Sequence, residues 1–375
     1  LDTATEYDNI LRLAKQRGYK FNGADTTTGH VTFYVLVPAN STGLGVDTRY
    51  LPILKKNSIV SSATGASFIL LDDVRFDHPA NFVVAARVNE TTGVPTHYAI
   101  KSTGKVISGV FGQKTVTIGA FERFRKITIT DSNIVEIISV MDSEGHEYFE
   151  VEYLSHDVVY KSVPNRDVNT RDNAPSLVRP FSAPRRFTTE KDRSTITLQF
   201  GYGSDSEIAA PTLADPSNVV LQRFSKSYIT DTAFDPSDLL GTDKLGVGPS
   251  NTTLTVTYRS NTVSSSNAAA NTVTRVTRPL VDFVDPTVAG TSKANEVISS
   301  MESSNEESIN GSVRLPNVEE IRRRTLDYFP TQNRAVTASD YEALAYAMPS
   351  EFGSIKKCHI VRDQDSLKRN LNMYV

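Results

Sequence analysis

The sequence contains no tryptophan and only one cysteine, Cys358. A single cysteine cannot form a disulfide within the chain, and without a cysteine cluster there is no thiolate set for a structural zinc ion. The shortage of cysteine therefore excludes a disulfide-stapled secreted scaffold. It is typical of a protein that is assembled in a reducing compartment.

A basic excess and long apolar runs are also lacking. Lysine and arginine number 40 against 43 aspartates and glutamates, which gives a net charge of −3. Binding to nucleic acid or to an anionic membrane surface needs clustered positive charge, so we expect neither partner. No segment approaches the roughly 20 apolar residues that span a bilayer, and no signal-peptide pattern follows Leu1. We expect a soluble protein without membrane insertion.

Alternating apolar and polar residues indicate that most of the chain forms β-strands. The chain has 375 residues, 39% hydrophobic and 22% charged, which suits two or three globular domains. The alternation is clearest in residues 31–37, 196–200 and 254–258. Other strand-like runs are residues 67–71, 82–86, 115–118, 126–129, 134–140, 148–154 and 356–361. The predicted fold class is α+β, mainly β, in an elongated multidomain chain with β-rich lobes and a C-terminal helical α+β module.

Helical patterns occur near both ends of the chain. Residues 3–17 carry apolar side chains at helical spacing. A second helix is predicted after Asn317, with acidic residues in its first turn. A third is predicted to begin at a capping box of Thr337 and Asp340 and to end before Pro349.

Changes in composition suggest the domain boundaries. Prolines gather in residues 165–193, where they remove ladder donors, and residues 299–315 are polar and acidic. The chain starts without methionine and ends in a strand-like pattern, so we expect a fragment of a longer protein. The predicted domains are residues 1–20 as the helical end of a missing N-terminal region, 21–164 as a β-rich domain, 165–193 as a Pro-rich extended connection, 194–298 as a second β lobe, 299–315 as a polar linker and 316–375 as a truncated α+β module.

No complete catalytic or metal-binding motif is found. None of the six histidines has the i, i+4 spacing that places two imidazoles on one helical face. The glycine pairs at 43–45, 201–203 and 246–248 complete no dinucleotide-binding or Walker loop, and we interpret them as turns. Cys358 lies in an apolar strand pattern that favours packing. We therefore predict no catalytic residue, no cofactor and no metal site, in a protein that is not an enzyme.

Four residues of the C-terminal helical segment are the predicted partner interface. Arg322 and Arg323 belong to the densest basic run, on a helix whose opposite side is apolar. Such a run is either a solvated face or a site for an acidic patch on a partner. Arg334 and Tyr341 either contact a partner or fix the turn between the two predicted helices.

Several segments, taken in order, form a pattern similar to that of a known family. They are GHVTF at 29–33, LKKNS at 54–58, GASF at 65–68, DDV at 72–74, LQFGYG at 198–203, LTVTYR at 254–259, EEIR at 319–322 and NRAVTASDYEAL at 333–344. The last segment is the most specific, because it combines Arg-Ala-Val-Thr and a following tyrosine with a capped helix. Over about residues 20 to 361, the chain resembles the baseplate J-like family of contractile-tail phages and, within it, the T-even-type wedge subunits of the inner ring.

The resemblance implies a structural role in a phage tail. Subunits of this kind pair with a second copy, join other baseplate wedge proteins and link adjacent wedges into a ring around the hub. Rearrangement of that ring is thought to trigger contraction of the sheath. The implied partners are a second copy of the chain, other wedge proteins, and baseplate hub or tail-tube proteins. The implied location is the tail baseplate of the virion, after assembly in the host cytoplasm.

Two other classes of function stay open. The β-rich, Thr- and Ser-laden lobes also fit a receptor- or glycan-binding tail protein, although the absence of tryptophan argues against exposed aromatic platforms. The only support for a wall-degrading hydrolase is the presence of generic carboxylate pairs, such as Asp72 and Asp73.

Overall fold

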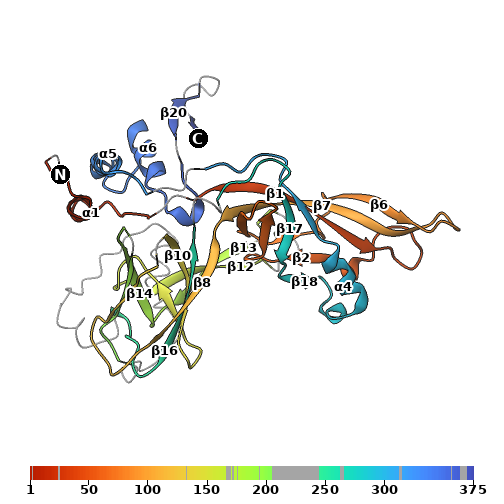
Figure 1. Ribbon diagram of the computed structural model, residues 1–375, viewed down its shortest axis with the longest axis horizontal. Coiled ribbons are helices and arrows are strands. Elements are labelled where there is room, and N and C mark those ends of the chain that lie inside the picture. The colour runs from red at the N-terminus through yellow and green to blue at the C-terminus, as the bar shows by residue number, and fades with distance from the viewer. Residues whose placement is uncertain are drawn as a thin grey trace. The chain divides into compact units, whose positions relative to one another are not determined.

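The structure is a computed structural model that describes residues 1, 3–23, 26–131, 133–165, 170, 173–174, 176–193, 195–204, 245–261, 266–311, 315–355, 357–363 and 370–375. It is mostly β, which confirms the predicted α+β, mainly β class. The chain divides into two compact units (Figure 1). Unit 1 comprises Leu1–Phe111 and Arg259–Val375, and unit 2 comprises Gly112–Tyr258. Unit 2 is therefore inserted in the sequence of unit 1.

A seven-stranded sheet forms the centre of unit 1. Its order is β1-β19-β17-β3-β4-β7-β6, and β1 also pairs with β7, so that the sheet closes on itself. Its strands are β1 (Thr28–Pro38), β3 (Ile59–Ser62), β4 (Ser67–Leu70), β6 (Phe82–Val88), β7 (Pro95–Ser108), β17 (Val273–Arg278) and β19 (Glu302–Ser304). Alternate apolar residues of β1 are buried, as the period-two pattern predicts. With Phe68 and Leu70 of β4 they form the main core of the unit.

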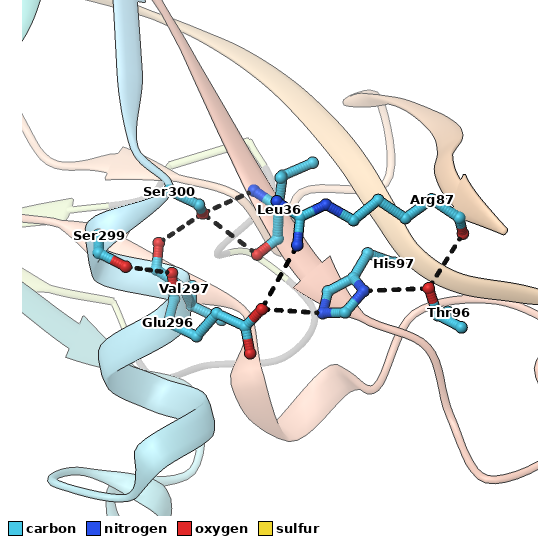
Figure 2. A network of polar contacts seen from close by, with 8 residues as sticks. All are labelled: Leu36, Arg87, Thr96, His97, Glu296, Val297, Ser299 and Ser300. Atoms are coloured by element: carbon cyan, nitrogen blue, oxygen red, sulfur yellow. Dashed lines mark hydrogen bonds and ion pairs between the residues drawn. The ribbon is translucent and has the colours of Figure 1, made fainter. Parts of the chain in front are cut away.

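A small sheet and a helix complete the β-rich part of unit 1. The sheet has the order β18-β2-β5. The elements are β2 (Pro52–Leu54), β5 (Val74–Arg75), β18 (Val281–Phe283), the helix α4 (Ser292–Ser299) and the 3₁₀ helices η1 (Thr48–Tyr50) and η5 (Pro286–Val288). The hydroxyl of Thr291 accepts a hydrogen bond from the Ala294 N–H and so caps α4. Beyond its last turn, Ser300 accepts a hydrogen bond from the Leu36 N–H of β1 (Figure 2). The last residues of the segment 194–298, which was predicted as a second β lobe, therefore form a helix.

The prediction of a polar linker over residues 299–315 is wrong. It contains β19, which pairs with both β1 and β17. Asn305 is fully buried, and its Oδ1 accepts hydrogen bonds from the N–H groups of Thr272 and Val273 at 3.0 and 2.9 Å. A polar composition does not exclude burial where each polar group finds a partner. Residues Glu302–Ser304 of this segment are therefore part of the closed sheet.

The ends of the chain meet in a helical module within unit 1. It contains α1 (Tyr7–Gln16), α5 (Val318–Tyr328), α6 (Ala338–Tyr346), the 3₁₀ helices η6 (Phe329–Thr331) and η7 (Ser350–Phe352), and the hairpin of β20 (His359–Arg362) and β21 (Leu371–Tyr374). Ile10 and Ala14 of α1 pack with Ile321 of α5 in a separate small core. The N-terminal helix, predicted as the end of another region, therefore shares a core with α5.

Unit 2 is built on a second seven-stranded sheet, with the order β8-β16-β10-β11-β14-β15-β9. Its strands are β8 (Val110–Thr117), β9 (Lys126–Ile129), β10 (Ile134–Met141), β11 (Glu147–Glu150), β14 (Arg186–Lys191), β15 (Ile196–Phe200) and β16 (Thr253–Ser260), and a separate ribbon pairs β12 (Val158–Pro164) with β13 (Ser176–Ser182). The sheet encloses a core in which Leu198, Phe200, Leu254 and Val256 are fully buried. The core residues alternate along β15 and β16, as the sequence predicts.

The predicted division into domains needs correction. Residues 165–193 were expected to form an extended connection, but β13 and β14 lie there, and Phe187 is buried in the core of unit 2. Pro180 fits β13 because it stands in a two-stranded ribbon, where a residue can lack one ladder bond. The predicted domains 21–164 and 194–298 each supply strands to both units. Composition could not reveal this, because strands distant in the sequence pair with one another.

Two of the glycine pairs interpreted as turns lie against each other in unit 2. The Gly203 N–H donates to the Gly246 carbonyl at 2.9 Å, and the Gly248 N–H donates to the Gly203 carbonyl at 2.9 Å. A Cβ on Gly201 would fall on the Gly246 carbonyl group. These glycines therefore serve a close approach of two backbone segments.

Candidate interaction surface

The four predicted interface residues lie on α5, on α6 and in the turn between them. Arg322 is turned toward its own unit. Its guanidinium lies 2.6 Å from a carboxylate oxygen of Glu319, and it also donates to the carbonyls of Ala4 at 2.7 Å and Leu1 at 3.3 Å. Arg322 therefore ties α5 to the residues before α1 within its own unit.

Arg323 points in a different direction from its neighbour. Its side chain is 85% exposed, and its nearest acidic group is Asp327, one turn along the helix at 3.7 Å. A solvent-exposed pair of this kind contributes only a few tenths of a kcal/mol. The charge of Arg323 is therefore accessible to a partner. Leu326, three residues along the same helix, is exposed as well.

Arg334 belongs to a tight turn between α5 and α6. Gln332 and Asn333 have left-handed backbone conformations, with φ of 48° and 60°. The Arg334 N–H donates to the Thr331 carbonyl at 2.9 Å, and its guanidinium donates to the Gln332 side chain at 2.8 Å. The Arg334 side chain is exposed. It therefore supports the turn and also presents its charge to solvent.

Tyr341 is half-buried on α6, directly behind the predicted capping box. The box is present: the Thr337 hydroxyl accepts from the Asp340 N–H at 3.3 Å, and the Asp340 carboxylate accepts from the Thr337 N–H at 2.8 Å. Val336, immediately before the cap, is 77% exposed. The capping box holds this turn in one conformation, and the apolar side chain of Val336 faces solvent.

Two of the exposed residues of this region are cations and three are large apolar side chains, and the exposed Asp327 lies among them. We call the cations and apolar residues the helical surface; its members are Arg323, Leu326, Phe329, Arg334 and Val336. Of the four predicted interface residues, Arg323 and Arg334 belong to it, Arg322 is engaged within the unit, and Tyr341 is only half accessible. Such a surface suits a protein partner with apolar side chains bordered by carboxylates.

Protonation of Asp340 is expected to loosen the start of α6. Backbone N–H donation from Thr337 holds the pKa of Asp340 below its usual range. A carboxylate whose pKa is lowered by folding stabilises the fold above its unfolded pKa, and this stabilisation is lost as the pH falls through the folded value. Asp340→Asn should therefore lower the melting temperature at pH 7, and the difference from the wild type should shrink below about pH 4.

Thermal unfolding followed by circular dichroism from pH 7 to pH 3 measures this effect. Glu90→Gln is a suitable control, because Glu90 is an exposed acid in the turn between β6 and β7 and does not cap a helix. A difference between Asp340→Asn and wild type that stays constant with pH would contradict the assignment.

Each unit also has an exposed apolar strand that the sequence does not reveal. All seven residues of β6 are exposed, and Phe82 is 68% exposed. In the ribbon of unit 2, Val178 is exposed to the same extent. The runs of Val and Phe in these strands look like those of buried strands, so no local signal distinguishes them.

Among the described residues, no group of three or more His, Cys, Asp or Glu side chains could hold a metal ion. No helix in that part of the chain has the length and apolar character needed to cross a membrane. No protein-family model matches the chain, and no curated protein is significantly similar to it.

Proposed function

We propose that the chain is a structural subunit of a contractile-phage baseplate wedge. In this role it self-associates, binds other wedge proteins and hub or tail-tube proteins, and links neighbouring wedges into the inner ring. It works through binding rather than catalysis, as part of the rearrangement that triggers sheath contraction. Its place is the tail baseplate of the virion, after assembly in the host cytoplasm.

The observation that carries this proposal is the turn before α6. The segment 333–344, which bears the strongest resemblance to the baseplate J-like family, forms a capped turn that exposes Arg334 and Val336. A turn fixed by backbone hydrogen bonds binds a partner with little loss of conformational entropy. An exposed apolar tip beside a cation is typical of a protein-binding element.

The presence of two units supports a subunit that takes part in a rearrangement. Each unit has its own apolar core. Units of this kind move as rigid bodies when an assembly changes state.

Antibody labelling of intact tails tests the proposal. Antibodies raised against the purified chain would be applied to contractile tails of the virus that encodes it, and the labelled tails viewed by electron microscopy. We expect label at the baseplate end, with pre-immune serum as the control. Label on fibres would instead favour the receptor-binding alternative, and unlabelled tails would refute the proposal.

A further inference from the structure

Strand β6 is an unprotected edge of the closed sheet in unit 1. In the described part of the chain it pairs with β7 and with no other strand (Figure 1). Phe82, Val83 and Val84 are 68%, 45% and 48% exposed. Natural edge strands usually carry lysine, proline or inward-pointing charges that prevent further pairing. The segment 82–86 has none of these and is a template for another strand.

Over residues 97–101, β7 lies between β1 and β6. A hydrogen bond of β1 therefore shows how the backbone of β6 is oriented. The Leu36 N–H of β1 donates to Ser300 at 3.0 Å, away from β7 (Figure 2). Leu36 stands opposite Ala99 of β7, so the backbone groups of Ala99 are directed to β6 instead. Ala99 is in turn opposite Val84, whose N–H and C=O therefore bond to β7.

Successive residues of a strand direct their backbone groups to opposite sides in the plane of the sheet. The N–H and C=O groups of Val83 and Ala85 therefore point away from β7, toward the open edge. A second copy of β6, related by a two-fold axis between the two Val84 residues, satisfies them: Val83 of each copy stands opposite Ala85 of the other. The two residues then exchange both backbone hydrogen bonds.

The charges around β6 favour an identical partner. No residue of the segment 82–86 is ionisable. Arg87, which follows, lies 3.6 Å from the Glu296 carboxylate of α4, where His97 also approaches at 3.4 Å (Figure 2). The nearest cation along the strand thus has an acidic neighbour in its own unit, in a solvent-exposed pair. A neutral strand meets a second neutral strand without like-charge repulsion, whereas a charged partner strand would find no counterion on it.

We propose that the chain dimerises by antiparallel pairing of β6 with β6 of a second copy, which makes one sheet continuous across both. This inference rests on the self-association in the proposed function and assigns it to a surface. A register shift after Ala85 ends the ladder, so the interface is short. We therefore expect a concentration-dependent dimer with a Kd in the micromolar range, roughly 1–100 μM.

Sedimentation velocity across a concentration series tests the surface. Val84→Lys places two ammonium groups face to face on the two-fold axis, and the exposed position tolerates lysine in the monomer. We expect the Kd of this variant to rise at least tenfold. The matched control is Val94→Lys, a position 42% exposed in the turn of the same hairpin but outside the ladder. Its Kd should equal that of the wild type.

Cysteine cross-linking tests the register. Val84→Cys brings two thiols together across the axis, so a mild thiol oxidant should give a covalent dimer. Phe82→Cys should not cross-link, because the two copies of residue 82 are four positions out of register, about 13 Å apart. The native Cys358 is buried and common to both variants.

The outcomes separate this inference from the proposed function. If the wild type dimerises and Val84→Lys dimerises equally well, the chain self-associates by another surface and the β6 pairing is wrong. A wild type that stays monomeric at every concentration also overturns the pairing, whereas tail labelling still decides the baseplate assignment. Cross-linking through residue 82 rather than 84 would overturn the register.

Discussion

Replacing Phe68 by alanine is expected to destabilise unit 1 by about 4 kcal/mol, the usual effect of removing a buried phenyl ring. Phe68 is fully buried on β4, where it pairs with Val60 on one side and Ser108 on the other. Its ring belongs to the core that the closed sheet surrounds. The loss combines the transfer free energy of the ring with that of the cavity left behind.

Urea unfolding of the whole chain, with hydrogen exchange of β4 and β15 to report on each unit, measures the effect. Exchange should accelerate in β4 and stay near the wild-type rate in β15. Phe352→Ala is the matched control, because Phe352 is 57% exposed in the same unit. Its effect should be within about 0.5 kcal/mol of zero. Equal effects of the two substitutions would refute the assignment of Phe68 to the core.

The second large effect is expected from Gly201→Ala in unit 2, at about 3 kcal/mol. The added methyl group would overlap the carbonyl of Gly246, which is backbone and cannot rotate away. The segments would have to separate, which breaks the hydrogen bond between Gly203 and Gly246. Gly246 has little room to move, because the buried Arg186 side chain packs against it.

Gly119→Ala provides the control for this substitution. It adds the same methyl group in the same unit, but nothing lies within 4 Å of the new atom. We expect an effect between zero and a small gain in stability. Hydrogen exchange should accelerate in β15 for Gly201→Ala and be unchanged for Gly119→Ala. Comparable stability of the two variants would show that the glycine segments do not approach closely.

The sequence predicts strands and helices where their signals are local. The alternation in β1, β15 and β16 and the box of Thr337 and Asp340 are both present in the structure. The grouping of strands into units was wrong, because β1 pairs with β19 and β3 pairs with β17 across the insertion. Such pairing joins strands that are far apart in the sequence, so the composition of a local segment cannot predict it.

The candidate site was predictable only in part. The basic run of α5 was visible in the sequence, but which arginine faces solvent depends on the residues before α1, whose carbonyls bind Arg322. Exposure of β6 was invisible, because exposed and buried apolar strands have the same period. Only the position of a strand within its sheet distinguishes them.

The insertion of unit 2 also affects the order in which the chain folds during synthesis on the ribosome. Thr32 of β1 pairs with Ser304 of β19, which leaves the ribosome roughly 270 residues later. At roughly 5–20 residues per second, β1 can pair with β7 early, but its other edge waits for tens of seconds for β19. Unit 2 is synthesised completely within that interval, so it has time to fold before unit 1 can close. Until β19 arrives, that edge of β1 is open to pairing with other chains, so translation speed should affect the yield of folded protein.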